Sequence, residues 1–136
     1  MADDVVVDVG HPDDIVAARQ AGHQLASDLG FSLTDVTMIA TAISEVARNI
    51  TSYAGFGAIR VALKVREGRQ ALVVRAEDDG PGIANIDRAM EDGYSTGRGL
   101  GLGLPGARRL MDRVIVESAP GQGTMIEMWK WVPNNG

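Results

Sequence analysis

The chain of 136 residues is 45% hydrophobic and 23% charged, which is the balance of one ordinary globular domain and excludes a disordered chain. Its formal net charge of -5 lacks the basic excess that a nucleic-acid coat protein needs, and without cysteine it has neither disulfides nor thiolate metal sites. An acidic start and the absence of an apolar run of about 18 residues predict no signal peptide and no membrane span, hence a cytoplasmic protein.

The first half of the chain predicts a strand followed by two helices. Residues 5–9 are typical of a short strand, and a helix is expected from residue 12 to about residue 29. The next helix has the clearest pattern, because Ser32 suits its N-cap and apolar residues recur at helical spacing to about residue 52.

The second half predicts four strands, which come as neighbouring hairpins. Two strands are expected at residues 58–65 and 71–76, around a Glu67-Gly68 turn, followed by a turn cluster at residues 78–82. A short helix at residues 86–91, a mobile glycine-rich loop at residues 93–103 and a helix at residues 105–112 come next. The last two strands are expected at residues 114–117 and 125–131. This order favours a single domain over residues 1–136, an α+β two-layer sandwich in which helices cover one face of a mixed, mainly antiparallel sheet. A doubly wound parallel sheet would alternate strand and helix more strictly.

Glu45 and Asn49 lie four residues apart on the second helix and therefore share one face, at the edge of its apolar stripe. A carboxylate and an amide so placed suit a hydrated divalent ion, and Glu45 could also accept a proton. Taken alone, the two residues are better explained as an exposed polar pair on a helix.

Two short glycine motifs follow strands. In Asp78-Asp79-Gly80-Pro81-Gly82 the glycines let the backbone approach a planar ligand, and Asp78 could accept a hydrogen bond from an exocyclic amine. Gly121-Gln122-Gly123-Thr124 enters the last strand. Each motif alone is also compatible with an ordinary tight turn.

The longest glycine motif alternates glycine with larger residues and runs into a helix that begins near Pro105: Gly97, Arg98, Gly99, Leu100, Gly101, Leu102, Gly103 and Leu104. Such a loop exposes backbone N–H groups beside a helix N-terminus, which favours phosphate binding over a flexible linker. The P-loop pattern does not occur, and the dinucleotide-like spacing lacks its preceding strand.

The four motifs occur in the order Glu-x-x-x-Asn, Asp-x-Gly-x-Gly, Gly-x-Gly-Leu-Gly-Leu, Gly-x-Gly-Thr. This order resembles the GHKL (Bergerat) ATP-binding fold shared by gyrase, Hsp90, histidine kinases and MutL, over roughly residues 12–131. Residues 40–50, 93–97 and 101–112 are most similar to the RsbT-type serine/threonine switch kinases of the bacterial stressosome, in the branch that regulates anti-sigma pathways.

The resemblance implies a role for each motif in binding magnesium-ATP. Asn49 would ligate the Mg2+ and Glu45 would be the general base. Asp78 would bind the adenine amine, with Gly80 and Gly82 under the base.

The remaining implied roles concern both ends of the nucleotide. Thr124 would support the adenine end, Gly99, Gly101 and Gly103 would wrap the phosphates, and residues 92–98 would form a lid. Arg19 lies on the first helix, where related kinases carry an arginine that reaches toward the terminal phosphate, although no sharp motif fixes this alignment.

The resemblance also implies partners. A chain of this size has no room for a histidine-bearing domain, so we expect a free-standing kinase of a serine or threonine on a STAS-domain antagonist or scaffold protein. Once released, it would bind and activate a downstream output protein, typically a phosphatase. The alternatives are an ATP-gated binding switch, in which catalysis is secondary, and a plain ATPase.

Overall fold

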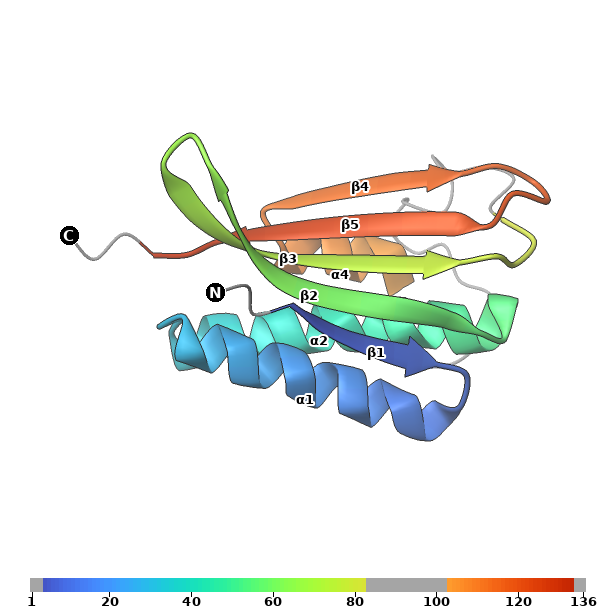
Figure 1. Cartoon of the computed structure of the whole chain (residues 1–136), viewed down its shortest axis with the longest axis horizontal. Helices are drawn as coiled ribbons and strands as arrows, with labels where there is room; N and C mark the ends of the chain where they lie inside the picture. The colour runs from blue at the N-terminus through green and yellow to red at the C-terminus, as the bar shows by residue number, and fades with distance from the viewer. Residues whose placement is uncertain (1–3, 83–102, 134–136) are drawn as a thin grey trace.

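Five strands form one sheet in the order β1-β2-β3-β5-β4, and every neighbouring pair is antiparallel. The computed structural model describes residues 4–82 and 103–133 (Figure 1). The strands are β1 (Val5–Val9), β2 (Gly57–Arg66), β3 (Arg69–Asp78), β4 (Arg113–Ser118) and β5 (Thr124–Trp131). The predicted α+β class with a mainly antiparallel sheet is confirmed.

The helices cover one face of this sheet, and α2 lies between α1 and α4 (Figure 1). They are α1 (Pro12–Asp28), α2 (Leu33–Asn49) and α4 (Gly103–Leu110), with a π-helical turn, η1 (Ile50–Ala54), directly after α2. Among the described residues, no helix is long and apolar enough to cross a membrane.

The core lies between the sheet and the helices. Alternate residues of the strands point toward the helices, as the period of two in a strand requires. Those with less than 4% exposure include Ile59, Val61, Leu72, Val74, Ile126 and Met128, and they meet Ile39, Ile43 and Val46 of α2. Full burial of one such aliphatic side chain stabilises a fold by about 1.5–3 kcal/mol, so the apolar stripe of α2 fixes this helix on the sheet.

Local hydrogen bonds explain where the first two helices begin. The predicted cap of α2 is confirmed, since Ser32 Oγ accepts a hydrogen bond from the Asp35 N–H at 3.1 Å. The cap of α1 was not predicted. His11 Nδ1 accepts from the Asp13 N–H at 3.2 Å, while Asp14 accepts from the backbone N–H of His11 at 3.0 Å, which completes a capping box.

Several element boundaries differ from those predicted. The second helix is α-helical only to Asn49 and continues as η1, in which the Gly55 N–H donates to the Ile50 carbonyl at 2.7 Å. The hairpin strands β2 and β3 are longer than expected. Helix α4 begins two residues before Pro105, which the first helical turn tolerates because its N–H groups have no helical partner. The expected short helix at residues 86–91 lies outside the described residues. Residues 93–102 of the expected loop lie outside them as well.

Candidate functional site

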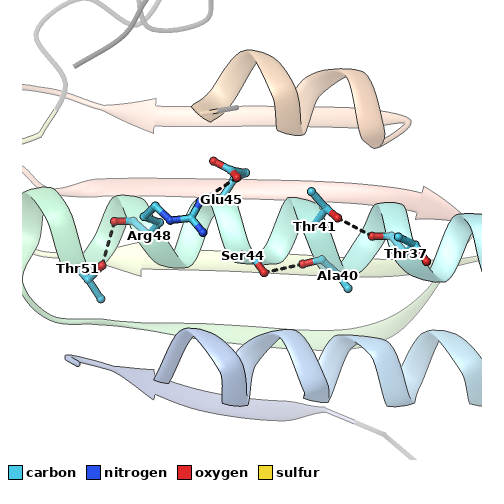
Figure 2. Close-up of polar contacts among 7 residues, drawn as sticks. All are labelled: Thr37, Ala40, Thr41, Ser44, Glu45, Arg48 and Thr51. Atoms are coloured by element: carbon cyan, nitrogen blue, oxygen red, sulfur yellow. Dashed lines mark hydrogen bonds and ion pairs between the residues drawn. The ribbon is translucent and has the colours of Figure 1, made fainter. Parts of the chain in front are cut away.

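Glu45 is buried near the C-terminal end of α2. The residue is 7% exposed, and among the described residues it is the only charged one in the buried class. Its Oε2 accepts a hydrogen bond from Arg48 Nη1 at 2.8 Å, one turn further along the helix (Figure 2). Burying a carboxylate costs free energy of folding unless the group is paired or hydrogen-bonded. The burial of Glu45 therefore indicates a specific role for this residue. For Glu45, the alternative of an exposed polar pair does not hold.

Asn49 is the last residue of α2 and is half-buried. The π-helical turn η1 begins with the next residue, and Thr51 Oγ1 donates to the Arg48 carbonyl at 3.1 Å across this junction (Figure 2). Single π-helical turns interrupt helices frequently at functional sites. Here the wider turn begins directly after the residue predicted to bind magnesium.

Asp78 ends β3 at the same end of the molecule. In the sheet it lies between Gly57 of β2 and Thr124 of β5. Its Oδ1 accepts a hydrogen bond from the Gly80 N–H at 2.9 Å, an Asx-type turn that bends the chain away from the strand. Asp78 is half-buried, so its carboxylate lies at the rim of the core.

Glycines bring the backbone at this end of the sheet into close contact. A Cβ atom on Gly80 would lie 2.6 Å from the Ala54 Cβ of η1, and one on Gly82 would overlap the Ala119 carbonyl. A Cβ on Gly123 would overlap the carbonyl oxygen of Asp78. These three glycines are therefore needed for packing, and the segment from Asp78 to Gly82 is held between η1 and the β4–β5 turn.

Thr124 is held by a hydroxyl pair that the sequence analysis missed. Its Oγ1 lies 2.8 Å from Ser118 Oγ, and Ser118 Oγ in turn donates to the Gly123 carbonyl at 2.8 Å. Ser118 faces Thr124 in the register of β4 and β5. Aligning the last two predicted strands as a hairpin would have paired these residues, and that alignment is the signal available in the sequence.

The structure brings two groups of predicted residues together. Asp78, Gly80, Gly82 and Thr124 gather at the end of the sheet. They are joined to η1, the turn that follows α2, because Gly80 packs on Ala54 and Gly57 packs on Ile50. Glu45 and Asn49 therefore lie on the helix that continues directly into η1, the turn that contacts this end of the sheet. The first two residues of α4, which packs against α2, are Gly103 and Leu104.

The other predicted residues are Arg19 and the members of the phosphate loop. Arg19 is exposed on α1, and within the described residues no hydrogen bond or ion pair joins it to Glu45 or Asn49. Six residues of the predicted phosphate loop lie outside the described residues: Gly97, Arg98, Gly99, Leu100, Gly101 and Leu102.

The donor groups fit a nucleotide-bound magnesium ion better than a metal cage. Within residues 4–82 and 103–133 there is no group of three or more His, Cys, Asp or Glu side chains that could hold a metal. Mg2+ commonly takes only one or two protein oxygens and completes its shell with phosphates and water. The amide oxygen of Asn49 is a suitable donor, and the Asp78 carboxylate is a suitable acceptor for an adenine amine.

Residues 34–134 match the family model described as histidine kinase-, DNA gyrase B-, and HSP90-like ATPase. The chain belongs to this family. Its members bind ATP, so the predicted family and the use of ATP are confirmed.

Two relatives refine the position within this ATPase family. The chain is 52% identical over 119 residues to the serine/threonine-protein kinase RsbT of Bacillus subtilis, covering 88% of this chain and 90% of the relative. It is 35% identical over 118 residues to the anti-sigma F factor of Clostridium acetobutylicum, covering 83% and 82%. These similarities confirm the predicted branch and the enzyme class, a protein serine/threonine kinase of the GHKL type that belongs with partner-switching regulators.

A solved structure shows the same fold at low sequence identity. The SiaB–SiaC complex of Pseudomonas aeruginosa contains a chain with a TM-score of 0.53 and 15% identity, and the match covers 94% of this chain and 89% of that one. This similarity supports the layered arrangement of sheet and helices.

Proposed function

We propose that this chain is a single-domain cytoplasmic kinase that transfers the terminal phosphoryl group of magnesium-ATP to a serine or threonine of a STAS-domain protein in a stressosome pathway. The observation that supports this most is the buried Glu45 carboxylate, one helical turn before Asn49 on a helix fixed to the sheet. The 52% identity to a serine/threonine-protein kinase supports the reaction class. The STAS substrate and a downstream phosphatase as output follow from the resemblance.

In this proposal the chain positions its reactants and manages one proton. Asn49 would hold the magnesium ion through its amide oxygen, and Asp78 would accept a hydrogen bond from the adenine amine, with Gly80 and Gly82 leaving room for the base. Magnesium-ATP, when bound, supplies the phosphoryl group and neutralises its charge. Glu45 accepts the proton of the acceptor hydroxyl. Phosphoryl transfer depends mainly on such positioning and charge neutralisation, with little covalent chemistry for the protein itself.

Phosphoryl transfer from labelled ATP to a STAS-domain protein tests the proposal. We expect magnesium-dependent labelling of a serine or threonine, and a loss of about 10²–10⁴-fold in Glu45→Gln, the range that a general base contributes. Binding of ATP, followed by titration calorimetry, should be retained in this variant. Glu77→Gln is the matched control, because Glu77 is an exposed carboxylate on β3 that pairs with Arg75. Equal transfer by wild type and Glu45→Gln would contradict the assignment of the base.

A second candidate function is an ATP-gated binding switch, and the 35% identity to an anti-sigma F factor favours it. In this case, the nucleotide sets the conformation that a partner recognises, and catalysis is secondary. Capture of STAS and output partners by Asn49→Ala and Glu45→Gln, in ATP and in ADP, separates the two functions. Nucleotide-dependent partner exchange by Glu45→Gln, which keeps ATP but loses transfer, would favour the switch, whereas exchange that fails along with transfer would favour the kinase. Asn49→Ala, which loses magnesium-ATP, should fail to exchange partners in both cases.

A further inference from the structure

The ion pair between Glu45 and Arg48 differs from the other ion pairs of the described residues. Its N···O distance of 2.8 Å is the shortest among them. The Glu45 side chain is 9% exposed and is the most buried carboxylate in any of these pairs, whereas the Arg48 side chain is 43% exposed. Charge-assisted hydrogen bonds of this length are the strong ones, and burial of one partner reduces competition from water.

We infer that Arg48 is a positioning residue for the general base: its guanidinium binds Glu45 Oε2 and fixes the orientation of the carboxylate toward the acceptor hydroxyl. This inference rests on the proposed function, in which Glu45 accepts that proton. Arg48 acts through Glu45 and is not assigned a contact with ATP or with the acceptor.

The geometry around Arg48 supports this role. Figure 2 shows the guanidinium reaching back along α2 toward Glu45. The backbone of Arg48 is held as well, because its carbonyl accepts a hydrogen bond from Thr51 at 3.1 Å at the start of η1. A glutamate has three rotatable side-chain bonds, so a restraint at its oxygen narrows the positions available to it. Reaction rates are sensitive to such placement, and a shift of about 1 Å can cost 100-fold.

A simpler interpretation is that the pair only stabilises the helix. Arginine is favourable in the last turn of a helix, and pairs at this spacing are common on helix surfaces. The chain also contains an exposed ion pair between β2 and the residue that precedes β1 for comparison: Arg60 and Asp4 lie 3.2 Å apart, with side chains 52% and 41% exposed. If the pair served stability alone, loss of Arg48 would change the unfolding midpoint and leave the rate of transfer intact.

A double-mutant cycle separates the two interpretations. The cycle compares Arg48→Met, Glu45→Gln and the double variant with the wild type, and Arg60→Met is the control. For each protein we would measure kcat and KM for magnesium-ATP at saturating STAS acceptor, the ATP affinity, and the midpoint of unfolding in urea. We expect Arg48→Met to lower kcat by about tenfold, a part of the roughly 10²–10⁴-fold that the base supplies. The KM and the ATP affinity should stay within about twofold, because only the chemical step is affected. In the Glu45→Gln background, loss of Arg48 should have no further effect on kcat.

Further outcomes distinguish the inference from the proposal beneath it. Arg48→Lys, which keeps the charge but loses the planar fork, should recover part of the rate. Three results would each overturn the positioning role and leave the proposed kinase function intact. They are a wild-type kcat in Arg48→Met, a change in KM alone, and losses of kcat that multiply fully in the double variant. Absence of transfer by the wild-type protein would overturn the proposed function and this inference with it.

Discussion

At the C-terminal end of α2 the candidate site is made of side chains, whereas at the neighbouring end of the sheet it is made mostly of closely packed backbone. The α2 side carries Glu45 and Asn49 on a helix whose position is fixed by the core. The sheet side carries Asp78 and several glycines, and three of those glycines touch atoms that leave no space for a Cβ.

This difference predicts that substitutions on the two sides will have different effects on activity and on stability. On α2, exchanging a functional group should change chemistry or affinity while the fold is kept, because the backbone there depends on the apolar stripe. At the end of the sheet, adding even one methyl group should displace backbone and weaken folding and nucleotide binding together. Glu45→Gln and Arg48→Met test the α2 side, and variants that add atoms or remove hydrogen bonds at the end of the sheet test the other side.

The largest effect is expected for Gly123→Ala. Gly123 has a φ of 77°, so alanine would add about 1–2 kcal/mol of backbone strain, and the new Cβ would overlap the Asp78 carbonyl, adding about 1–3 kcal/mol of overpacking. We expect the free energy of unfolding, from urea titration, to fall by the sum of both costs, and ATP affinity to fall as well.

Gly121→Ala is the matched control for this variant. Gly121 lies in the same turn with a φ of 76°, but a Cβ placed there meets nothing within 4 Å. It should show only the backbone strain, about 1–2 kcal/mol, and near-normal ATP binding. If the two glycine variants lose equal stability, the contact between Gly123 and Asp78 does not constrain the site.

Local patterns in the sequence predicted most of the fold. Hydrophobic spacing located the core helix, Ser32 located its start, and Glu67-Gly68 located a hairpin turn whose two residues both have positive φ. The π-helical turn was not predicted, because residues 50–54 continue the helical pattern and their geometry depends on a contact between Ala54 and Gly80, which are distant in the sequence.

The candidate site was predicted less completely than the fold. The order of the motifs and the resemblance that it carries predicted site roles for Glu45, Asn49 and Asp78, and these roles stay predictions. Burial of Glu45 depends on tertiary packing: α2 lies between α1 and α4, so a residue at the edge of its apolar stripe becomes enclosed. The partners Arg48 and Ser118 were not predicted either, since an arginine or a serine at those places is equally common on a solvent-exposed surface.

A smaller effect is expected for Ala54→Val, which tests the contact that joins the two sides of the site. Ala54 packs against Gly80 through η1, and two extra methyl groups would press on the turn after Asp78. We expect a loss of stability of about 1–3 kcal/mol, as for other overpacked positions, and weaker ATP binding by titration calorimetry. Ser52→Val adds comparable bulk to an exposed position of the same turn and should leave affinity unchanged. Equal affinities in both variants would show that η1 and the Gly80 turn are independent.

The smallest effect is expected where hydrogen bonds alone are removed. Ser118→Ala deletes the hydroxyl that bonds Thr124 and the Gly123 carbonyl, and the expected loss is about 1 kcal/mol, the net value of a typical hydrogen bond. Thr124→Val removes the other hydroxyl of the pair without changing its shape much. Because each hydroxyl acts partly through the other, the double variant should lose less stability than the two single losses added together. Thermal unfolding of the three variants measures this coupling. Strict additivity would mean that the hydroxyl pair does not act as a unit and that each hydroxyl stabilises the end of the sheet independently.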